Sequence, residues 1–403
     1  MTELSAPAVR NENGKGIALL AAQIVPVMAI VSLFPAIPKL FQQFGGIAHA
    51  NLLVPMILTI PALMVALTAP IAGALADRFG RRPSFLTGMF LYTAMGLVPI
   101  FTANIAVIVA SRAILGIAEA IAVTVSSALI GDYFGERRQK WTSWVGIVIS
   151  PAGTLMLVAG GLLAEWDWRG PFYIYLLTIP ILVLALIYID EPQQSRAALS
   201  VTNRLPFPWR ASMAIGALTL VASLIYYVEP LNIARVLTGI RITSPAIAGI
   251  VQAITTSGYV IGALVYRRIS GRPVADHMAI SWLFMGLGMV VIGLSGTLFG
   301  VGLGAVIQQI GAGFTIPALL SWGQARLPFE QRARGMGIWT TAFFIGTFLC
   351  PPILTGVEQL TGGLPPAIAV LGFVSLAAAL AAMWAGRRYA RSPAGAFPTS
   401  IEA

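Results

Sequence analysis

Two ionisable side chains lie within a long apolar stretch of this sequence, where a charge is unfavourable unless it faces water or a partner. Arg112 and Glu119 are seven residues apart, with Gly116 between them. On a helix that turns about 100° per residue, they fall within roughly 20° of one another and about 10 Å apart along the axis. We expect both side chains to face one cavity and to be functional. A structural pair that stabilises a helix bundle is the alternative.

Glu229, which precedes Pro230, is the second candidate carboxylate for proton transfer. It either opens onto the same cavity or lies at the membrane interface beside Arg235. Glu119 is the acid placed deepest in an apolar stretch. Because the protonation of a carboxyl group changes with the wetting of its surroundings, Glu119 would load and release a proton as its surroundings change.

Other polar and aromatic side chains within apolar stretches are candidates for lining a substrate cavity. They are uncharged, which favours small amphipathic organic compounds over sugars or phosphates as cargo. We expect about half of them to face the cavity, since such residues also serve helix packing. The candidates are Gln23, Tyr226, Tyr227, Gln252, Thr255, Thr256, Tyr259, Trp339 and Thr340.

Membrane-spanning helices are the elements that must hold these side chains. The chain has 403 residues, of which 57% are hydrophobic and 10% charged, which excludes an ordinary soluble domain and a disordered chain. A bilayer core of about 30 Å needs roughly 20 apolar residues per helix. Seven uncharged stretches fit one helix each: 17–38, 52–76, 141–164, 170–189, 211–228, 242–266 and 335–357.

Five further spans bring the expected number to twelve. The stretch 84–130 divides into two at residues 102–104, and the stretch 277–325 divides into two near residues 296–297. The last span covers residues 366–386 and stops at a pair of arginines. We therefore expect an all-α integral membrane protein.

The basic residues predict how these spans are oriented. With the N-terminus inside the cell, 20 of the 25 Lys and Arg residues fall in inside segments. Lys39, Arg169, Arg235 and Arg241 fall outside, and Arg112 lies within a span. Because short inside loops hold the excess of basic residues, we expect both termini in the cytoplasm. The basic residues form short clusters rather than a stripe, which excludes nucleic acid as a partner.

A weak internal repeat divides the chain into two six-helix halves. The segment 73–83 resembles the segment 262–273, and Pro35 pairs with Pro230 at an offset of 195 residues. Transporter folds are built from such repeats. We expect a pseudo-symmetric pair, with residues 1–190 as the first half, 191–210 as a cytoplasmic linker and 211–403 as the second half.

Residues that would support an enzyme or a metal centre are sparse. Cys350 is the single cysteine, and the two histidines, His49 and His277, are far apart in the sequence. No His, Cys, Asp or Glu cluster has the spacing of a metal site, and no nucleotide-binding glycine loop occurs. We therefore expect no cofactor, no metal and no enzymatic activity.

The segment 73–82 resembles the hallmark loop of the major facilitator superfamily, Gly-x-x-x-Asp-Arg-x-Gly-Arg-Arg. The resemblance implies a conformational latch made by Gly73, Asp77, Arg78, Gly80, Arg81 and Arg82. In that family the carboxylate, here Asp77, interacts with the N-terminus of the eleventh helix, expected near residues 334–337. Tyr266 replaces the acid in the second-half copy.

Two further motifs extend the resemblance to proton-coupled drug exporters of the superfamily. Arg112 and Gly116 are similar to the Arg-x-x-x-Gly element of the fourth helix, whose arginine is linked to proton transfer there. Trp168, Arg169 and Phe172 resemble a motif of the drug-exporting branches, although the fifth-helix antiporter signature is incomplete at residues 150–154. The resemblance implies a monomeric secondary transporter of a cell membrane, the inner membrane in a bacterium. It would work by alternating access, with proton-coupled efflux of small amphipathic compounds. A proton-coupled uptake carrier or a facilitator for a small metabolite is the alternative.

Overall fold

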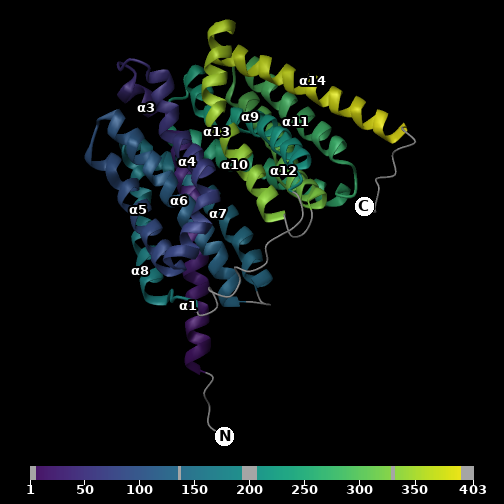
Figure 1. Ribbon diagram of the computed structural model, residues 1–403. Coiled ribbons are helices and arrows are strands. Elements are labelled where there is room, and N and C mark those ends of the chain that lie inside the picture. Colours follow the sequence, from purple (N-terminus) through teal and green to yellow (C-terminus); the bar gives the residue numbers. More distant parts are fainter. Residues whose placement is uncertain (1–5, 135–137, 193–206, 328–331, 392–403) are drawn as a thin grey trace.

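The computed structural model describes residues 6–134, 138–192, 207–327 and 332–391, and helices dominate throughout them (Figure 1). The first crossing is divided into α1 (Ala6–Ala22), α2 (Val25–Ile30), the 3₁₀ segment η1 (Val31–Ala36) and α3 (Ile37–Phe44). The next five crossings are α4 (Ala50–Phe79), α5 (Arg81–Phe101), α6 (Ile105–Phe134), α7 (Arg138–Trp166), and the 3₁₀ segment η3 (Gly170–Leu177) with α8 (Thr178–Tyr188). The last six are α9 (Trp209–Gly239), α10 (Pro245–Ile269), α11 (Val274–Leu294), α12 (Leu298–Arg326), α13 (Arg332–Thr361) and α14 (Leu364–Arg391).

The prediction of an all-α membrane protein with twelve crossings is confirmed. Within the described residues, 11 helical segments are long and apolar enough to cross a membrane. Helix α7 is the remaining long helix and occupies the place expected for the fifth crossing. The predicted divisions are also present, since α5 and α6 separate at residues 102–104 and α11 and α12 at residues 295–297.

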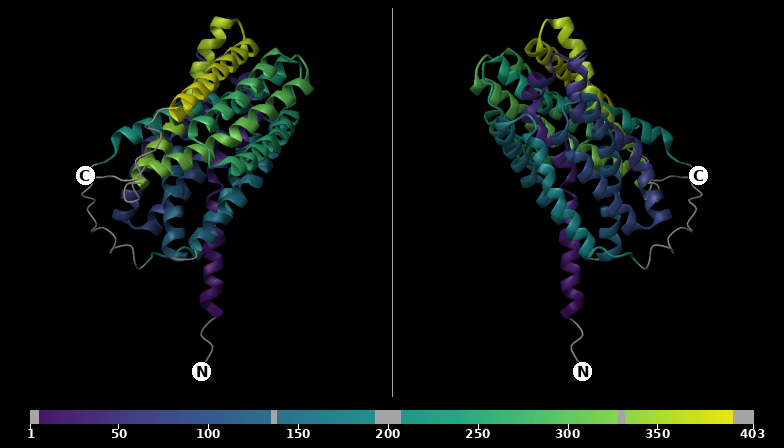
Figure 2. Two further views of the ribbon diagram at one scale, coloured as in Figure 1. Left: turned by 90° about the vertical axis from the view of Figure 1, so that its right-hand side faces the viewer. Right: turned by 90° about the vertical axis from the view of Figure 1, so that its left-hand side faces the viewer.

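For the description below, the helices from α1 to α8 are called the N-terminal half and those from α9 to α14 the C-terminal half; Figure 1 colours them from purple to teal and from teal-green to yellow. In the N-terminal half, α6 packs against α4 and α5; in the C-terminal half, α11 packs against α12 and α14, and α10 against α12. The two halves meet where α7 packs on α10 and α13 packs on α4. Figure 2 shows the same helices from two further sides. Most of the predicted linker 191–210 lies outside the described residues.

The first crossing is not the single continuous helix that the span 17–38 predicts. Pro26, Pro35 and Pro38 fall within it, and a proline has no N–H to donate to the preceding turn. The backbone therefore changes from α-helix to 3₁₀-helix and back. The sixth crossing departs from prediction in the same way, since it begins with a 3₁₀ segment that carries Pro171 in its first turn.

Polar contacts distinguish the two ends of the bundle. At the end that carries the arginine-rich loops, called the basic end below, Lys15 lies 3.0 Å from Asp190. At the opposite end, called the far end, Arg235 lies 3.0 Å from Glu358. These charged pairs hold the ends of helices whose middle portions are apolar.

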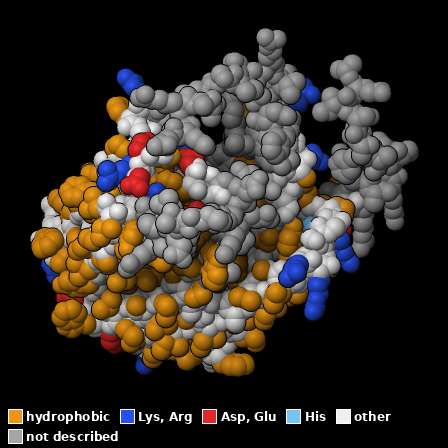
Figure 3. Space-filling view, turned by 90° about the horizontal axis from the view of Figure 1, so that it is seen from below, with side chains coloured by type: hydrophobic (Ala, Val, Ile, Leu, Met, Phe, Trp, Pro, Cys, Tyr) orange, Lys and Arg blue, Asp and Glu red, His pale blue; other side chains and the backbone are white. Residues whose placement is uncertain are grey.

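Large apolar side chains cover the flanks of the bundle. Leu67, Phe90 and Ile254, in the middle portions of α4, α5 and α10, are each more than half exposed. Figure 3 shows hydrophobic side chains over much of the described surface seen from below, with Lys and Arg side chains toward its edges. Such surface is unfavourable in water but natural against lipid. The protein is therefore a multi-pass membrane protein.

Candidate functional site

Arg112 is fully buried on α6 and donates hydrogen bonds to the backbone of two neighbouring helices. Its Nε donates to the carbonyl oxygen of Ile57 at 3.1 Å, and its Nη2 donates to that of Ala29 at 2.6 Å. The guanidinium also lies 5.1 Å from the ring centroid of Tyr175. Arg112 thus sits in packed protein, where carbonyl dipoles and an aromatic face replace water around its charge.

Two tyrosines complete the polar contacts of the broken first crossing. Tyr92 on α5 donates its hydroxyl to the carbonyl oxygen of Val25 at 2.7 Å. Tyr175 on η3 donates to the carbonyl oxygens of Met28 and Ala29 at 3.3 and 3.4 Å. Neither tyrosine was among the residues predicted from the sequence. The prolines of this segment were the available signal, because an interrupted helix leaves carbonyl groups that need donors.

Glu119 lies two turns beyond Arg112 on α6 and is only 3% exposed. Its Oε2 has no hydrogen-bond partner. Among the described residues, no ion pair or hydrogen bond joins Glu119 to Arg112. The carboxyl group of Glu119 is therefore buried with one oxygen unsatisfied.

Glu229 on α9 is the buried carboxylate of the C-terminal half, with 2% of its surface exposed. Its Oε2 accepts a hydrogen bond from Nε2 of Gln309 at 2.7 Å, and its Oε1 has no partner. Arg235, the neighbour that the interfacial alternative required, pairs with Glu358. Glu229 is therefore buried between α9 and α12, where Gln309 is its hydrogen-bond partner.

Pro230 interrupts the hydrogen bonding of α9 beside Glu229, and two glutamines compensate for it. The carbonyl oxygen of Tyr226, four residues earlier, cannot accept from Pro230 and instead accepts from Nε2 of Gln308 at 3.2 Å. The carbonyl oxygen of Pro230 accepts from Nε2 of Gln252 at 2.9 Å. Gln308 and Gln309 were not among the sequence candidates, although Pro230 signalled that donors were needed.

Aromatic rings from α9 and α13 form a cluster that begins three residues before Glu229 on α9. The ring centroids of Tyr226 and Tyr227 are 4.9 Å apart, and those rings lie 5.9 and 5.7 Å from Phe343. Trp339 stacks on Phe343 at 5.4 Å. Tyr226, Tyr227 and Trp339 are all candidates from the sequence, and the structure brings them together.

The other predicted cavity residues do not all join this cluster. Gln23 donates to Ser126 and Ser127 on α6 at 2.8 and 3.0 Å. The hydroxyl of Thr256 lies 3.5 Å from that of Thr154 in the other half. Tyr259 is half-buried on α10. Thr255 and Thr340 donate to carbonyl oxygens of their own helices.

The loop between α4 and α5 is tied to other helices of the N-terminal half. The backbone N–H groups of Arg81 and Arg82 donate to the two oxygens of Glu191, each at 2.8 Å, and Arg81 lies 2.9 Å from Asp132. Gly80 has a φ of 96°, which favours glycine at this turn. Gly73 has open space beside it, and Arg78 is exposed.

The predicted contact of this loop with the start of α13, near residues 334–337, is not fully described. The backbone of these residues is helical, but the side chains of Asp77 and Arg334 are outside the described structure. The latch between them remains a prediction from the sequence.

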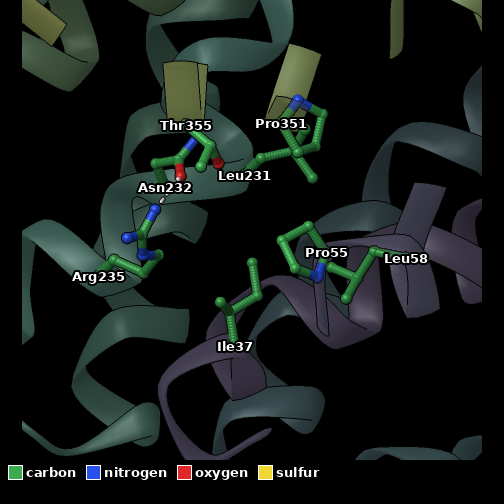
Figure 4. Close-up of a pocket in the computed structure, with 8 residues that line it drawn as sticks. All are labelled: Ile37, Pro55, Leu58, Leu231, Asn232, Arg235, Pro351 and Thr355. Atoms are coloured by element: carbon green, nitrogen blue, oxygen red, sulfur yellow. Dashed lines mark hydrogen bonds between the residues drawn. The ribbon is translucent and has the colours of Figure 1, made fainter. Parts of the chain in front are cut away.

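A small pocket lies between the halves at the far end (Figure 4). Its N-terminal wall is formed by Ile37, Pro55 and Leu58, and its C-terminal wall by Leu231, Asn232, Arg235, Pro351 and Thr355. The guanidinium of Arg235, which lies at the edge of the pocket in Figure 4, is 5.2 Å from the ring of Phe41 in the other half. This end of the bundle is therefore closed by contacts between the halves.

A family model described as Major Facilitator Superfamily matches residues 19–231, more than half of the chain. The chain belongs to the major facilitator superfamily. It is a membrane transporter of small molecules and not an enzyme, and it resembles the drug:proton antiporters of the superfamily.

Two curated relatives carry that resemblance. The multidrug transporter protein MdtP of Bacillus subtilis is 27% identical over 191 residues, which cover 47% of this chain and 34% of that protein. The tetracycline resistance protein, class B, of Escherichia coli is 25% identical over 178 residues, which cover 44% of each chain. The matches thus span less than half the length of these two relatives.

Solved structures of the superfamily share the fold of this transporter. A nucleoside transporter, NupG, superposes with a TM-score of 0.76 over 92% of this chain and 99% of that chain, at 10% identity. A bacterial homologue of the human lysosomal transporter Spinster, in an inward-facing and unoccupied conformation, gives a TM-score of 0.74 over 96% of this chain and 100% of that chain, at 16% identity. At these identities the likeness shows the fold alone.

Proposed function

We propose that this superfamily member exports small amphipathic organic compounds by alternating access, in exchange for protons carried by Glu119. The observation that carries the proposal is the carboxyl group of Glu119 on α6, which is 3% exposed and has one oxygen without a partner. A group that gains a proton when dry and loses it when wet converts a change of access into proton movement.

Arg112 supports this cycle without exchanging protons itself. Its guanidinium is anchored on the carbonyl oxygens of Ala29 and Ile57, so it stays in place while the wetting of Glu119 changes. A fixed positive charge two turns away favours the ionised form of Glu119 once water reaches it. Glu229 is the second proton-carrying candidate, held by Gln309 in the C-terminal half.

The direction of transport rests on the relatives. Multidrug and tetracycline resistance proteins are among the proteins to which the chain is similar. The cluster of Tyr226, Tyr227, Trp339 and Phe343 suits partly apolar cargo. Uptake of a small metabolite is the alternative, and direction is open to direct measurement.

We further propose that the basic end faces the cytoplasm, so that both termini are cytoplasmic and the far end faces outward. Residues 1–190 and 211–403 then form the two moving halves of a monomer, in the inner membrane if the source is bacterial. The latch of Gly73, Asp77, Arg78, Gly80, Arg81 and Arg82 would hold the cytoplasmic side closed in the outward-open state. The contacts of Arg235 with Phe41 and of Glu165 with Ser244 close the far end, which supports an inward-facing state for the structure.

Transport into inside-out vesicles tests the proposal. An acidic vesicle lumen would drive protons out through the transporter and cargo in, so an exporter accumulates cargo in proportion to the pH gradient. Right-side-out vesicles would accumulate cargo instead if the protein is an uptake carrier. A rate of cargo accumulation that does not change with the pH gradient in either preparation would contradict proton coupling.

A further inference from the structure

Three arginines at the basic end of the C-terminal half lack acidic partners. Arg267 and Arg268 lie in the last turn of α10, Arg272 lies in the turn that follows, and all three side chains are exposed. Among the described residues, no ion pair or side-chain hydrogen bond involves these three guanidinium groups. Asp276, in the first turn of α11, is the next acid in the sequence and forms no ion pair with them. Arg267, Arg268 and Arg272 are called the arginine cluster below.

The similar loop of the N-terminal half has its positive charge compensated. Arg81 lies 2.9 Å from Asp132, and the backbone N–H groups of Arg81 and Arg82 donate to the carboxylate of Glu191. In the view from below, blue side chains lie beside red ones on one part of the described surface and without red neighbours on another (Figure 3). The two loops therefore differ in charge, although their sequences resemble each other.

Tyr266 holds the helix ends that carry the arginine cluster. Its hydroxyl donates to Oγ of Ser321 on α12 at 3.0 Å, and its ring centroid lies 4.9 Å from that of His277 on α11. Nε2 of His277 lies 2.9 Å from the carbonyl oxygen of Ile269, the last residue of α10. The arginine cluster therefore extends from a platform of three connected helix ends.

Arg326 at the end of α12 is a fourth exposed arginine of this platform. It follows Ser321 on the same helix, and its guanidinium lies 5.2 Å from the ring centroid of Trp322. Tryptophan and basic side chains are typical of helix ends at a membrane surface. The platform therefore has the composition of a surface at the level of lipid headgroups.

One side of α10 next to the arginine cluster is covered by exposed apolar side chains. Ile261, Leu264 and Val265 are 47%, 58% and 40% exposed, and they are called the apolar stripe below. Arg268 lies seven residues after Ile261 and four after Leu264, so helical spacing places these three residues on one side. In a bilayer, acyl chains cover such a stripe, and the arginine at its end reaches the headgroup level.

We propose that this surface binds an anionic phospholipid, with its acyl chains against the apolar stripe and its headgroup phosphate bound by the arginine cluster. A guanidinium group donates parallel hydrogen bonds to phosphate oxygens. A zwitterionic lipid brings a positive charge of its own and compensates the arginines less well. A soluble phosphate compound would leave the apolar stripe without a partner. This inference concerns the lipid-facing surface and is independent of the proposed export.

Two lipids with the same acyl chains but different headgroups provide the test. Binding of phosphatidylglycerol and of phosphatidylcholine is measured by native mass spectrometry on the purified full-length transporter in detergent. We expect the first phosphatidylglycerol to bind at least tenfold more tightly than the first phosphatidylcholine. Equal binding of the two lipids would overturn the inference. Displacement of phosphatidylglycerol by inorganic phosphate, at an ionic strength matched with chloride, would show a site for free phosphate instead and would also overturn it.

Variants assign the lipid preference to the arginine cluster. Arg267→Gln, Arg268→Gln and Arg272→Gln should each weaken binding of phosphatidylglycerol about fivefold and leave binding of phosphatidylcholine unchanged. The control Arg241→Gln removes an exposed arginine shortly before the other end of α10 and should bind both lipids like the wild type. If the control weakens binding as much as the cluster variants do, the affinity follows the net charge of the protein and the inference fails.

Discussion

Glu165 at the end of α7 accepts a hydrogen bond from the hydroxyl of Ser244, 2.8 Å away in the other half of the transporter. The same carboxylate oxygen accepts the backbone N–H of Ala246 at 3.2 Å. Ser244 is also the N-cap of α10, since its hydroxyl accepts the N–H of Ile247. A carboxylate at a helix N-terminus is stabilised by the helix dipole. The C-terminal half thus has one of its helices capped by the N-terminal half, and this cap must be lost when the far end opens.

Replacing Glu165 should therefore favour the state that is open at the far end. Glu165→Gln keeps the volume but removes the charge, which weakens the cap by about 0.3–1 kcal/mol and shifts a balanced equilibrium about two- to fivefold. Single cysteines placed on α9 at the two ends of the bundle, in a Cys350→Ala background, would report the shift by their labelling rates. The control Asp167→Asn alters a neighbouring carboxylate that caps Arg169 within its own half. Equal labelling in both variants would show that Glu165 does not bias the equilibrium.

The crossing of α7 and α10 is held together by glycines. A methyl group on Gly249 would lie 2.4 Å from the carbonyl oxygen of Leu157, and one on Gly161 would lie 2.5 Å from that of Pro245. Distances this short require the two backbones to separate. The halves can pack closely at the far end only because these positions lack side chains.

Gly249→Ala should consequently hold the far end open and slow transport. We expect the rate to fall by at least tenfold while the protein remains folded, because the strain acts between the halves and is relieved when they separate there. The control Gly302→Ala introduces the same side chain where no atom lies within 4 Å. Cargo uptake into vesicles and labelling of far-end cysteines would check both variants. Normal transport by Gly249→Ala would mean that the crossing does not tighten during the cycle.

Much of this fold could be predicted from hydropathy and charge. The turns that divide two long apolar stretches into separate helices are an example. The turns at residues 102–104 and 295–297 are found where polar or small residues interrupt apolar stretches long enough for two helices. Arg112 and Glu119 share one side of α6 as helical spacing requires. Such features depend on local sequence alone, and a window of about 20 residues captures them.

The contacts of the site depend on tertiary packing, which the sequence pattern does not contain. Pro230 indicates that the carbonyl group of Tyr226 lacks its helical donor, but not that Gln308, 82 residues away, supplies one. Arg112 was expected to face a cavity, yet its Nε and Nη2 donate to the backbone of α4 and α2, and its Nη1 is buried without a partner. Hydropathy reports how apolar a span is and says nothing about which carbonyl groups a proline frees or which side chain reaches them.

The glutamine that supports the α9 kink should matter for stability. Gln308→Leu keeps similar volume but leaves the carbonyl oxygen of Tyr226 buried without a donor, which should lower the free energy of unfolding by about 1–3 kcal/mol. Thermal unfolding in detergent, followed by loss of monodisperse protein, would show a lower midpoint. Gln324→Leu is the control, because Gln324 is exposed near the basic end of α12. A midpoint equal to that of the control would mean that another donor replaces Gln308.

Glu119→Gln should uncouple transport from the pH gradient. Glutamine has nearly the same shape as a protonated glutamate but cannot release a proton, so the transporter would be held in its proton-loaded form. In inside-out vesicles with an acidic lumen, the wild type should accumulate cargo, whereas the variant should show at least a hundredfold lower accumulation rate with the protein still folded. Glu229→Gln provides the matched comparison, since the two acids are equally buried but Glu229 already has Gln309 as a partner. If Glu119→Gln responds to the pH gradient like the wild type and Glu229→Gln does not, Glu229 on α9 carries the proton. Glu119 would then serve packing or cargo recognition instead.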